Sequence, residues 1–451
     1  MAGITVRCCR LVEPMKRTKI VKMLYGREGM ELRLPVSAAV LEGTAPAAIG
    51  DPHRASLEAM AHPIGSLPLA ELVARRRPGT VAITISDITR PVPNKLFLPA
   101  MLECLNSAGV ADRQIVIIIG TGMHRPSTAA EREIMLGRDL LSRLEVIDHT
   151  ADDPASLLRV SDRPPISVCR RFASANFRIV TGYIEPHFMA GFSGGRKGVC
   201  PAMVDLATVQ RFHGYRTLAD PRADNGILEG NPCHEISLKV ARKVGVDFLF
   251  NVAITRDRRI AGIYCGGLEE AHQAGCRDVA KWTTATIDGP FDLVVTNGGG
   301  FPLDQTFYQT VKGMCTAAPA LGRRSTLLIV SHCGQQLGSP GYTELMLRWA
   351  NHWRAFLAAI AASRRTLLDQ WELQMQARIL ARVGVGRLWF ASDGVPAEMQ
   401  KRIAVHPILG TGTAASRAQR AIDQFLVDHP AASVAVIPDG PYTMLRRGKA
   451  K

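Results

Sequence analysis

The residues with the clearest chemical potential lie in one glycine-rich segment, residues 185–198, with the sequence EPHFMAGFSGGRKG. It combines His187 and Ser193 with four glycines and two adjacent cations, Arg196 and Lys197. A backbone with so few side chains can wrap closely around a ligand, and the cations supply positive charge to an anion. An apolar run that predicts a strand precedes the segment, and loops of this kind hold phosphorylated cofactors in α/β sheets. We therefore predict a binding loop for an anion or cofactor, with Lys197 as a candidate for covalent attachment.

Two known phosphate-binding motifs do not fit this segment. A P-loop needs glycine directly before its lysine and Ser or Thr directly after it, whereas Arg196 precedes Lys197 and Gly198 follows. No G-x-G-x-x-G opens a helix after the strand either. A loop that only turns the chain is the alternative, and His187 and Lys197 make it the weaker interpretation.

Further polar side chains follow other apolar runs. Arg90 follows a predicted strand over 80–85 and suits a two-point grip on a carboxylate, while His124 follows a second strand over 114–119. His124 and His187 could therefore flank a substrate as two acid–base groups. Tyr308 and Lys312 are four residues apart and share one helix face. Together these groups suit a small hydroxy or keto acid.

Each of these positions also has a purely structural interpretation. His124 could be a hydrogen bonder that stabilises its loop, and Arg90 could pair with Asp87. Tyr308 and Lys312 could form an exposed helix face. The combination of these residues is more specific than any one of them, because all of them suit the binding of one kind of ligand, a small hydroxy or keto acid.

Apolar runs that predict strands alternate with helical stretches along the chain, which indicates an α/β fold with mainly parallel sheets flanked by helices. The predicted strands cover residues 80–85, 114–119, 179–183, 247–252, 293–296, 326–330, 387–391 and 433–437, with a helix over 99–108 and a long helical segment over 348–383. Because ligands bind at the carboxyl ends of parallel strands, we place the active site in an interdomain cleft.

The length of 451 residues favours two domains. We predict a basic N-terminal extension over 1–20, an N-terminal α/β domain over 21–288 with the cofactor loop and catalytic histidines, and a C-terminal α/β domain over 289–451 with the substrate-binding Tyr/Lys helix.

The composition excludes several classes of partner. The net charge of +15 is spread over short arginine clusters without aromatic interleaving or a nucleic-acid module, so we expect no nucleic-acid partner. No run approaches the roughly 18 apolar residues of a membrane span, so we expect no membrane partner. Ten cysteines form no C-x-x-C pair. Without a recognisable secretory signal we expect reduced thiols and a cytoplasmic protein.

Taken together, the motifs resemble those of the nickel-dependent lactate racemase family, whose enzymes carry a nickel-pincer nucleotide. The matching pieces run in the family's order and cover most of the chain: Asp87-x-Thr89-Arg90-Pro91, Gly120-Thr121-Gly122-x-His124-Arg125-Pro126, the 185–197 loop, His213, Gly299-x-x-Pro302-Leu303-Asp304-Gln305, Tyr308-Gln309-x-x-Lys312 and Asp369-Gln370-Trp371. The glycine loop with its lysine is the most specific piece.

The resemblance implies a role for each matched residue. Lys197 would carry the cofactor, pyridinium-3,5-bisthiocarboxylic acid mononucleotide, through a thioamide, and His213 would be the one protein ligand of nickel. His124 and His187 would be the catalytic pair. The remaining assignments are cofactor binding for Asp87, Ser193, Gly194, Gly195 and Arg196, and substrate binding for Arg90, Tyr308, Gln309, Lys312 and Trp371. The maturation proteins that make the cofactor would be partners.

The activity implied is racemisation or epimerisation of a 2-hydroxy acid by proton-coupled hydride transfer through a 2-keto acid. Met189 departs from the bulkier aromatic expected near His187 in a lactate enzyme, which points to a different substrate side chain. Two alternatives stay open. One is a metal-dependent hydrolase or lyase that uses His124, His187 and His213 as metal ligands. The other is a non-catalytic cofactor-binding protein.

Overall fold

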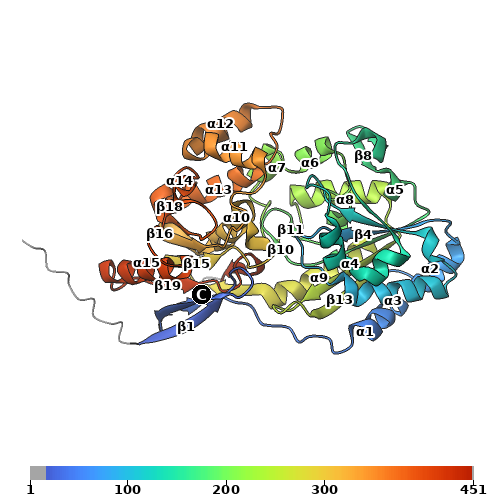
Figure 1. Ribbon diagram of the computed structural model, residues 1–451, viewed down its shortest axis with the longest axis horizontal. Coiled ribbons are helices and arrows are strands. Elements are labelled where there is room, and N and C mark those ends of the chain that lie inside the picture. The colour runs from blue at the N-terminus through green and yellow to red at the C-terminus, as the bar shows by residue number, and fades with distance from the viewer. Residues whose placement is uncertain (1–16, 449–451) are drawn as a thin grey trace, which may run out of the picture.

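A computed structural model describes residues 17–448 of the chain, which form two α/β halves (Figure 1). The first half is built on a six-stranded sheet in the order β13-β12-β9-β4-β5-β6. Its strands are β4 (Val81–Ser86), β5 (Ile115–Gly120), β6 (Glu145–Asp148), β9 (Phe177–Tyr183), β12 (Phe248–Ile254) and β13 (Ile260–Gly266). All neighbours pair in parallel except β13, which is antiparallel to β12 at the edge.

Helices cover both faces of this sheet because its strands are apolar on both sides. Alternate residues of β4 show the division, with Ile83 in the core shared with α1–α4 and Ala82 in the core shared with α5, α6, α8 and α9. The helices are α1 (Pro52–Ala61), α2 (Leu69–Arg76), α3 (Asn94–Ser107), α4 (Ala129–Arg143), α5 (Arg170–Ala173), α6 (Leu206–Phe212), α7 (Tyr215–Ala219), α8 (Pro232–Val244) and α9 (Leu268–Thr283). Two short antiparallel pairs complete this half, β7 (Leu157–Asp162) with β8 (Pro165–Cys169), and β10 (Pro186–His187) with β11 (Gly191–Phe192).

The second half has a parallel six-stranded sheet in the order β18-β17-β16-β15-β19-β3. Its strands are β3 (Ala39–Val40), β15 (Phe291–Asn297), β16 (Leu321–Val330), β17 (Leu388–Ala391), β18 (His406–Pro407) and β19 (Val434–Val436). One face packs against α10 (Phe307–Ala317), α11 (Pro340–Trp349), α12 (Trp353–Ala362) and α13 (Gln370–Val383), with α14 (Ala397–Gln400) nearby in the chain. The other face packs against α15 (Ala414–Asp428) and the hairpin of β1 (Thr18–Met23) and β2 (Met30–Pro35).

The α/β class with parallel sheets flanked by helices is confirmed, and each predicted strand is present. The predicted helical segment over 348–383 is wrong as a single element, because α12 ends at Ala362 and α13 begins at Gln370. The polar stretch between them, with Arg364 and Arg365, lies exposed. The helix predicted over 99–108 begins earlier, at Asn94, and has Pro99 inside it.

The start of the chain crosses to the second half, which the predicted division at 21 and 288 did not foresee. β3 pairs with β19, and in Figure 1 the blue β1 hairpin lies beside the red C-terminal elements. Near the other end, β20 (Met444–Arg447) pairs with β14 (Thr284–Ile287). The apolar alternation of residues 18–35 specifies a buried face but not which sheet covers it. Residues 1–16 of the predicted N-terminal extension lie outside the described part.

Candidate active site

A cleft of about 150 Å³ lies where the two halves meet, at the carboxyl ends of β4, β5 and β9. Its lining comes from both halves and includes these predicted residues: Asp87, Arg90, His124, His187, Ser193, Gly194, Lys197, His213, Tyr308, Gln309, Lys312 and Trp371. Gly195 and Arg196 are the predicted residues that do not line it. The loops that the sequence analysis expected to converge therefore line one cleft.

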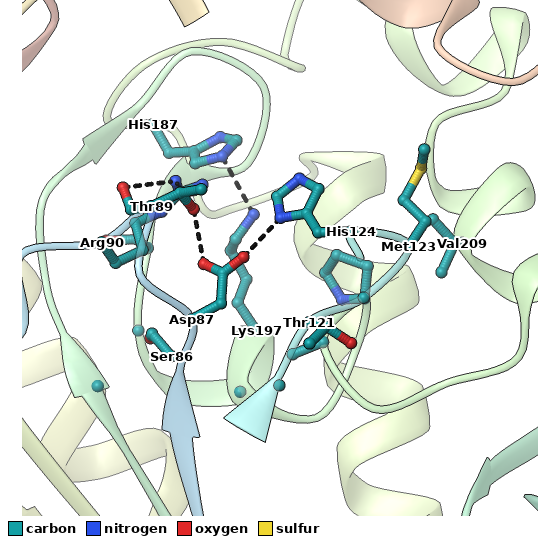
Figure 2. A pocket seen from close by; sticks show the side chains of 18 of the residues that line it. Ser86, Asp87, Thr89, Arg90, Thr121, Met123, His124, His187, Lys197 and Val209 are labelled. Atoms are coloured by element: carbon teal, nitrogen blue, oxygen red, sulfur yellow. Dashed lines mark hydrogen bonds and ion pairs between the residues drawn. The ribbon is translucent and has the colours of Figure 1, made fainter. Parts of the chain in front are cut away.

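Asp87 and His124 form a close pair at the ends of two neighbouring strands (Figure 2). The Asp87 Oδ2 atom lies 2.6 Å from His124 Nδ1, and the Thr89 hydroxyl donates to Asp87 Oδ1 at 2.6 Å. Although burial opposes ionisation, His124 and Arg90 lower the pKa of Asp87. The ionised carboxylate fixes the proton of His124 at Nδ1, and the Nε2 atom is left to accept a proton.

Arg90, which follows β4, is held by one hydrogen bond and one ion pair. Its Nη1 atom donates to Thr89 Oγ1 at 3.1 Å, and its Nε atom lies 3.7 Å from Glu185 Oε1. Glu185 in turn accepts from the Tyr183 hydroxyl. Despite desolvation, Glu185 and Asp87 raise the pKa of Arg90, so the guanidinium is a fixed cation.

His187 and Lys197 face each other across the glycine loop, with Lys197 Nζ 3.1 Å from His187 Nε2 (Figure 2). The backbone N–H groups of Met189 and Ala190 donate to His187 Nδ1 at 3.3 and 3.2 Å. A neutral ring with Nδ1 as acceptor carries its proton at Nε2. Burial and the charge of Lys197 lower the pKa of His187 well below its usual range, so the ring is neutral.

The Lys197 amine is poised as a nucleophile. Burial and the nearby Arg90 lower the pKa of Lys197 to about 7, so much of it is uncharged near neutral pH. An uncharged amine accepts the His187 Nε2 proton and can also attack an electrophilic carbon. The position of Lys197 thus supports the prediction that this lysine forms a covalent bond.

His213 follows the last residue of α6 and stacks on Trp371 of α13, with the ring centroids 4.3 Å apart. Its Nδ1 atom lies 2.9 Å from the Val209 carbonyl oxygen, which leaves Nε2 as the atom available for a metal. Burial, more than Lys197, lowers the pKa of His213 to about 3. The ring is therefore neutral and able to ligate over the whole physiological range.

The substrate-binding candidates of the second half come from α10 and α13. The Trp371 indole donates to the Tyr308 hydroxyl at 2.6 Å, which ties the two helices together. Gln309 and Lys312 lie on α10, and the Thr306 hydroxyl caps this helix by accepting from the Gln309 N–H. Burial and Arg90 lower the pKa of Lys312.

Two predicted cofactor ligands, Arg196 and Ser193, form hydrogen bonds within the first half that hold the glycine loop in place. The Arg196 guanidinium donates to the Ala190 carbonyl at 2.6 Å and lies 3.0 Å from His272 Nε2, so it supports the loop instead of facing the cleft. The Ser193 hydroxyl lines the cleft but donates to the Tyr183 carbonyl at 2.9 Å. Residue type alone did not show that these two polar groups close the loop internally.

Four residues of the site carried no sequence prediction of their own. Thr89 and Glu185 hold Asp87 and Arg90, Asn251 accepts from the Gly195 N–H at 2.6 Å, and Glu372 lines the cleft beside Trp371. A carboxylate directly after a matched tryptophan was the available signal for Glu372.

Within residues 17–448 no three His, Cys, Asp or Glu side chains lie close enough together to hold a metal ion. His124, His187 and His213 line one cleft but do not form a three-histidine ligand set. The hydrolase alternative, which requires that set, therefore lacks its site in this geometry.

These observations define a class: a two-sheet α/β protein whose basic cleft is lined by three histidines and by a buried lysine of lowered pKa. Two family models match the chain, the lactate racemase N-terminal domain over residues 25–226 and the lactate racemase C-terminal domain over residues 287–444. The chain belongs to the lactate racemase family, and it is an isomerase of the racemase type.

Individual relatives agree with this assignment. The chain is 33% identical over 383 residues to a lactate racemase of Lactiplantibacillus plantarum, covering 84% of this chain and 87% of that protein. It is 30% identical over 392 residues to a lactate racemase of Thermoanaerobacterium thermosaccharolyticum, covering 86% of this chain and 89% of that one. The structure of the latter's apoprotein superposes with a TM-score of 0.85 at 27% identity, covering 95% of this chain and all of that one. A Thermotoga maritima protein at 17% identity and a TM-score of 0.67, covering 88% of this chain and 99% of that one, shares the fold.

Proposed function

We propose that this protein racemises or epimerises a 2-hydroxy acid with a nickel-pincer nucleotide bound through Lys197. The observation that carries the proposal is the juxtaposition of an uncharged, reactive lysine, a neutral candidate metal ligand and an aspartate-bound histidine in one cleft. The metal would have one imidazole from the protein, His213, which agrees with the lack of a larger ligand cluster among the described residues. The chain's residues therefore fit the group.

When bound, the cofactor supplies a hydride acceptor that removes and returns the hydrogen on C2 of the substrate. Arg90 and Lys312 bind the substrate carboxylate, which places the C2 hydroxyl within reach of the histidines. His124 accepts the hydroxyl proton at Nε2, and the Asp87 carboxylate stabilises the imidazolium that forms.

His187 serves as the second acid–base group after Lys197 is modified. In the unmodified chain its Nε2 atom is engaged with the Lys197 amine at 3.1 Å. A thioamide nitrogen is a poor acceptor, so tethering at Lys197 would release His187 Nε2 to the substrate. Two histidines from separate loops place an acid–base group on each side of the hydroxyl, as inversion requires. His187 accepts a proton at Nε2 in the tautomer that carries its own proton on Nδ1.

The experiment that tests the proposal is intact-mass spectrometry with metal analysis, on protein from cells that make the cofactor. We expect a mass increase that maps to Lys197 and one nickel per chain. Lys197→Arg should lose the adduct, whereas His213→Ala should keep the adduct and lose nickel. An unmodified Lys197 in metal-bound, active protein would instead favour the hydrolase or lyase alternative.

The non-catalytic alternative is tested by the same preparation. His124→Ala and His187→Ala should retain nickel and lose racemisation, as followed by chiral chromatography of a panel of 2-hydroxy acids.

The proposal includes maturation proteins as partners, because the cofactor must be made and delivered. It also includes a cytoplasmic location, and all eight cysteines among the described residues are free thiols. No helix of the described chain has the length and apolarity to span a membrane.

A further inference from the structure

The wall of the cleft formed by α10 and α13 carries two buried polar side chains whose acceptors no protein group satisfies. Glu372 is 2% exposed and Gln309 is 9% exposed, and both line the cleft. Glu372 Oε2 and Gln309 Oε1 have no hydrogen-bond partner among residues 17–448. Buried polar atoms are nearly always paired, because leaving one unpaired forfeits its hydration without compensation.

An ion pair does not account for Glu372. The cation with the largest charge interaction is Lys312, yet among the described residues no Lys, Arg or His nitrogen lies within 4.0 Å of the Glu372 carboxyl group. Burial raises the pKa of Glu372 while Lys312 opposes the rise. In either protonation state a carboxyl group keeps an oxygen that accepts a hydrogen bond, so a donor in the cleft can pair with Glu372 in both states.

We propose that Glu372 determines specificity by accepting a hydrogen bond from a hydroxyl on C3 of the substrate, with Gln309 as a second acceptor. The substrate class is then a 2,3-dihydroxy acid or a longer sugar acid. This inference rests on the proposed function for the orientation of the substrate, with its carboxylate on Arg90 and Lys312.

Other substrate side chains fit these acceptors less well. A methyl group in the same place would leave Glu372 and Gln309 unpaired, and such sites reject analogues that lack the hydroxyl. A second carboxylate brings only acceptor oxygens, so it would leave Gln309 Oε1 without a donor. An ammonium group would enter a cleft that already holds Arg90, Lys197 and Lys312. A hydroxyl is a donor without either conflict, and the flexible Met189 in the lining leaves room for a chain longer than methyl.

The test measures binding to the purified full chain by calorimetry, with glycerate, lactate and malate as the probes. We expect glycerate to bind at least tenfold more tightly than lactate, and malate to bind more weakly than glycerate. Glu372→Leu should reduce the glycerate-to-lactate ratio to about one. Glu372→Gln keeps an acceptor and adds a fixed amide donor, so it should retain most of that ratio and improve malate binding.

Gln376→Leu is the matched control, since Gln376 lies on the same helix with an unpartnered buried oxygen among the described residues but does not line the cleft. It should leave the ratio unchanged. Equal affinities for glycerate and lactate in the unaltered chain would overturn the inference, as would an unchanged ratio in Glu372→Leu. Because binding is measured without turnover, a preference for glycerate in a protein that racemises no 2-hydroxy acid would support this inference while refuting the proposed function.

Discussion

At the scale of residues, the site works by pairing each reactive group with one that sets its protonation state. Asp87 fixes the tautomer of His124, and Lys197 faces the one nitrogen of His187 that carries a proton. Burial keeps His187 uncharged and lowers the pKa of Lys197 to about 7, in a cleft where Arg90 is a permanent cation. These relationships make two residue-level predictions.

Replacing Asp87 with Asn should lower kcat for racemisation by about 100-fold or more, the scale of a general acid–base contribution. The amide leaves the shape in place but removes the charge that stabilises the His124 imidazolium. KM should change much less, because Arg90 keeps Glu185 as its partner. Steady-state kinetics would show this. Thr89→Val is the milder comparison, because it removes one hydrogen bond to Asp87 and one from Arg90 but leaves the Asp87 charge in place. Equal losses in both variants would contradict the assignment.

Acylation of Lys197 should follow a titration with a midpoint near pH 7, the value to which burial and Arg90 lower its pKa. Below that pH the amine is protonated and unreactive, and above it the free amine reacts. Trace labelling with acetic anhydride, followed by peptide mass spectrometry, measures the profile of the unmodified chain. The exposed Lys22 serves as an internal reference. A Lys197 profile that parallels Lys22 would refute the predicted reactivity.

At the scale of elements, the glycine loop depends on close backbone approach. Gly195 has a φ of +54°, and a Cβ there would lie 2.5 Å from the His272 ring. Gly194 has a φ of +72° and is backed by Asn251. The loop therefore packs against β12 and α9 without space for side chains at these two positions. This close packing fixes where the backbone of the neighbouring Lys197 lies relative to the cleft.

Gly195→Ala should lower the free energy of unfolding by about 2 kcal/mol or more, from the left-handed backbone and the overpacking against His272. It should also change the rate at which Lys197 is acylated, because the loop must move. Thermal unfolding and the labelling assay report the two effects. Gly289→Ala is the control, since nothing lies within 4 Å of its added Cβ. If both variants were equally stable, the close packing of the loop would be disproved.

At the scale of the whole molecule, the cleft exists only because two sheets meet. Helix α13 links them, with Gln374 Nε2 donating to the Tyr215 carbonyl at 3.0 Å and Arg378 Nη1 donating to the Ala223 carbonyl at 3.0 Å. The chain also crosses between halves through β3. Burial also keeps several histidines uncharged, among them His213 and His272, which gives the stability of the molecule a pH dependence.

His272 isolates this effect, because it is 2% exposed and burial, more than Arg196, holds its pKa well below 6.5. The unfolded chain binds this proton below pH 6.5 and the folded chain does not. The contribution of His272 is therefore fully present above pH 6.5 and is lost as pH falls, by up to about 1.4 kcal/mol per pH unit. Buried carboxyls such as Glu372, whose pKa is raised, act in the opposite direction. The contribution of His272 is therefore obtained as the difference in unfolding free energy between the unaltered chain and a variant that lacks this histidine.

We expect the difference in unfolding free energy between the unaltered chain and His272→Gln to be largest near pH 7 and to shrink between pH 6.5 and pH 5. Urea denaturation at a series of pH values measures it. A difference that is independent of pH would show that His272 titrates normally in the folded chain.

The sequence by itself determined the fold class and the membership of the site. Apolar runs such as 114–119 are buried on both faces, and such runs occur where helices cover a parallel sheet. The order of polar residues after those runs was enough to predict that Arg90, His124, His187 and Lys197 share one cleft, since parallel strands end on one edge. The resemblance to a family added the identity of the cofactor loop.

Only the tertiary structure decided which polar side chains face the cleft and which form contacts that support the loops. Arg196 and Lys197 are adjacent cations, yet one supports the loop from behind and the other enters the cleft. Glu372 became a candidate only when its oxygen proved to lack a partner among the described residues. The crossing of β3 to the second sheet was equally hidden. Local sequence encodes burial and periodicity, whereas the partner of a buried group is set by contacts between residues far apart in the chain.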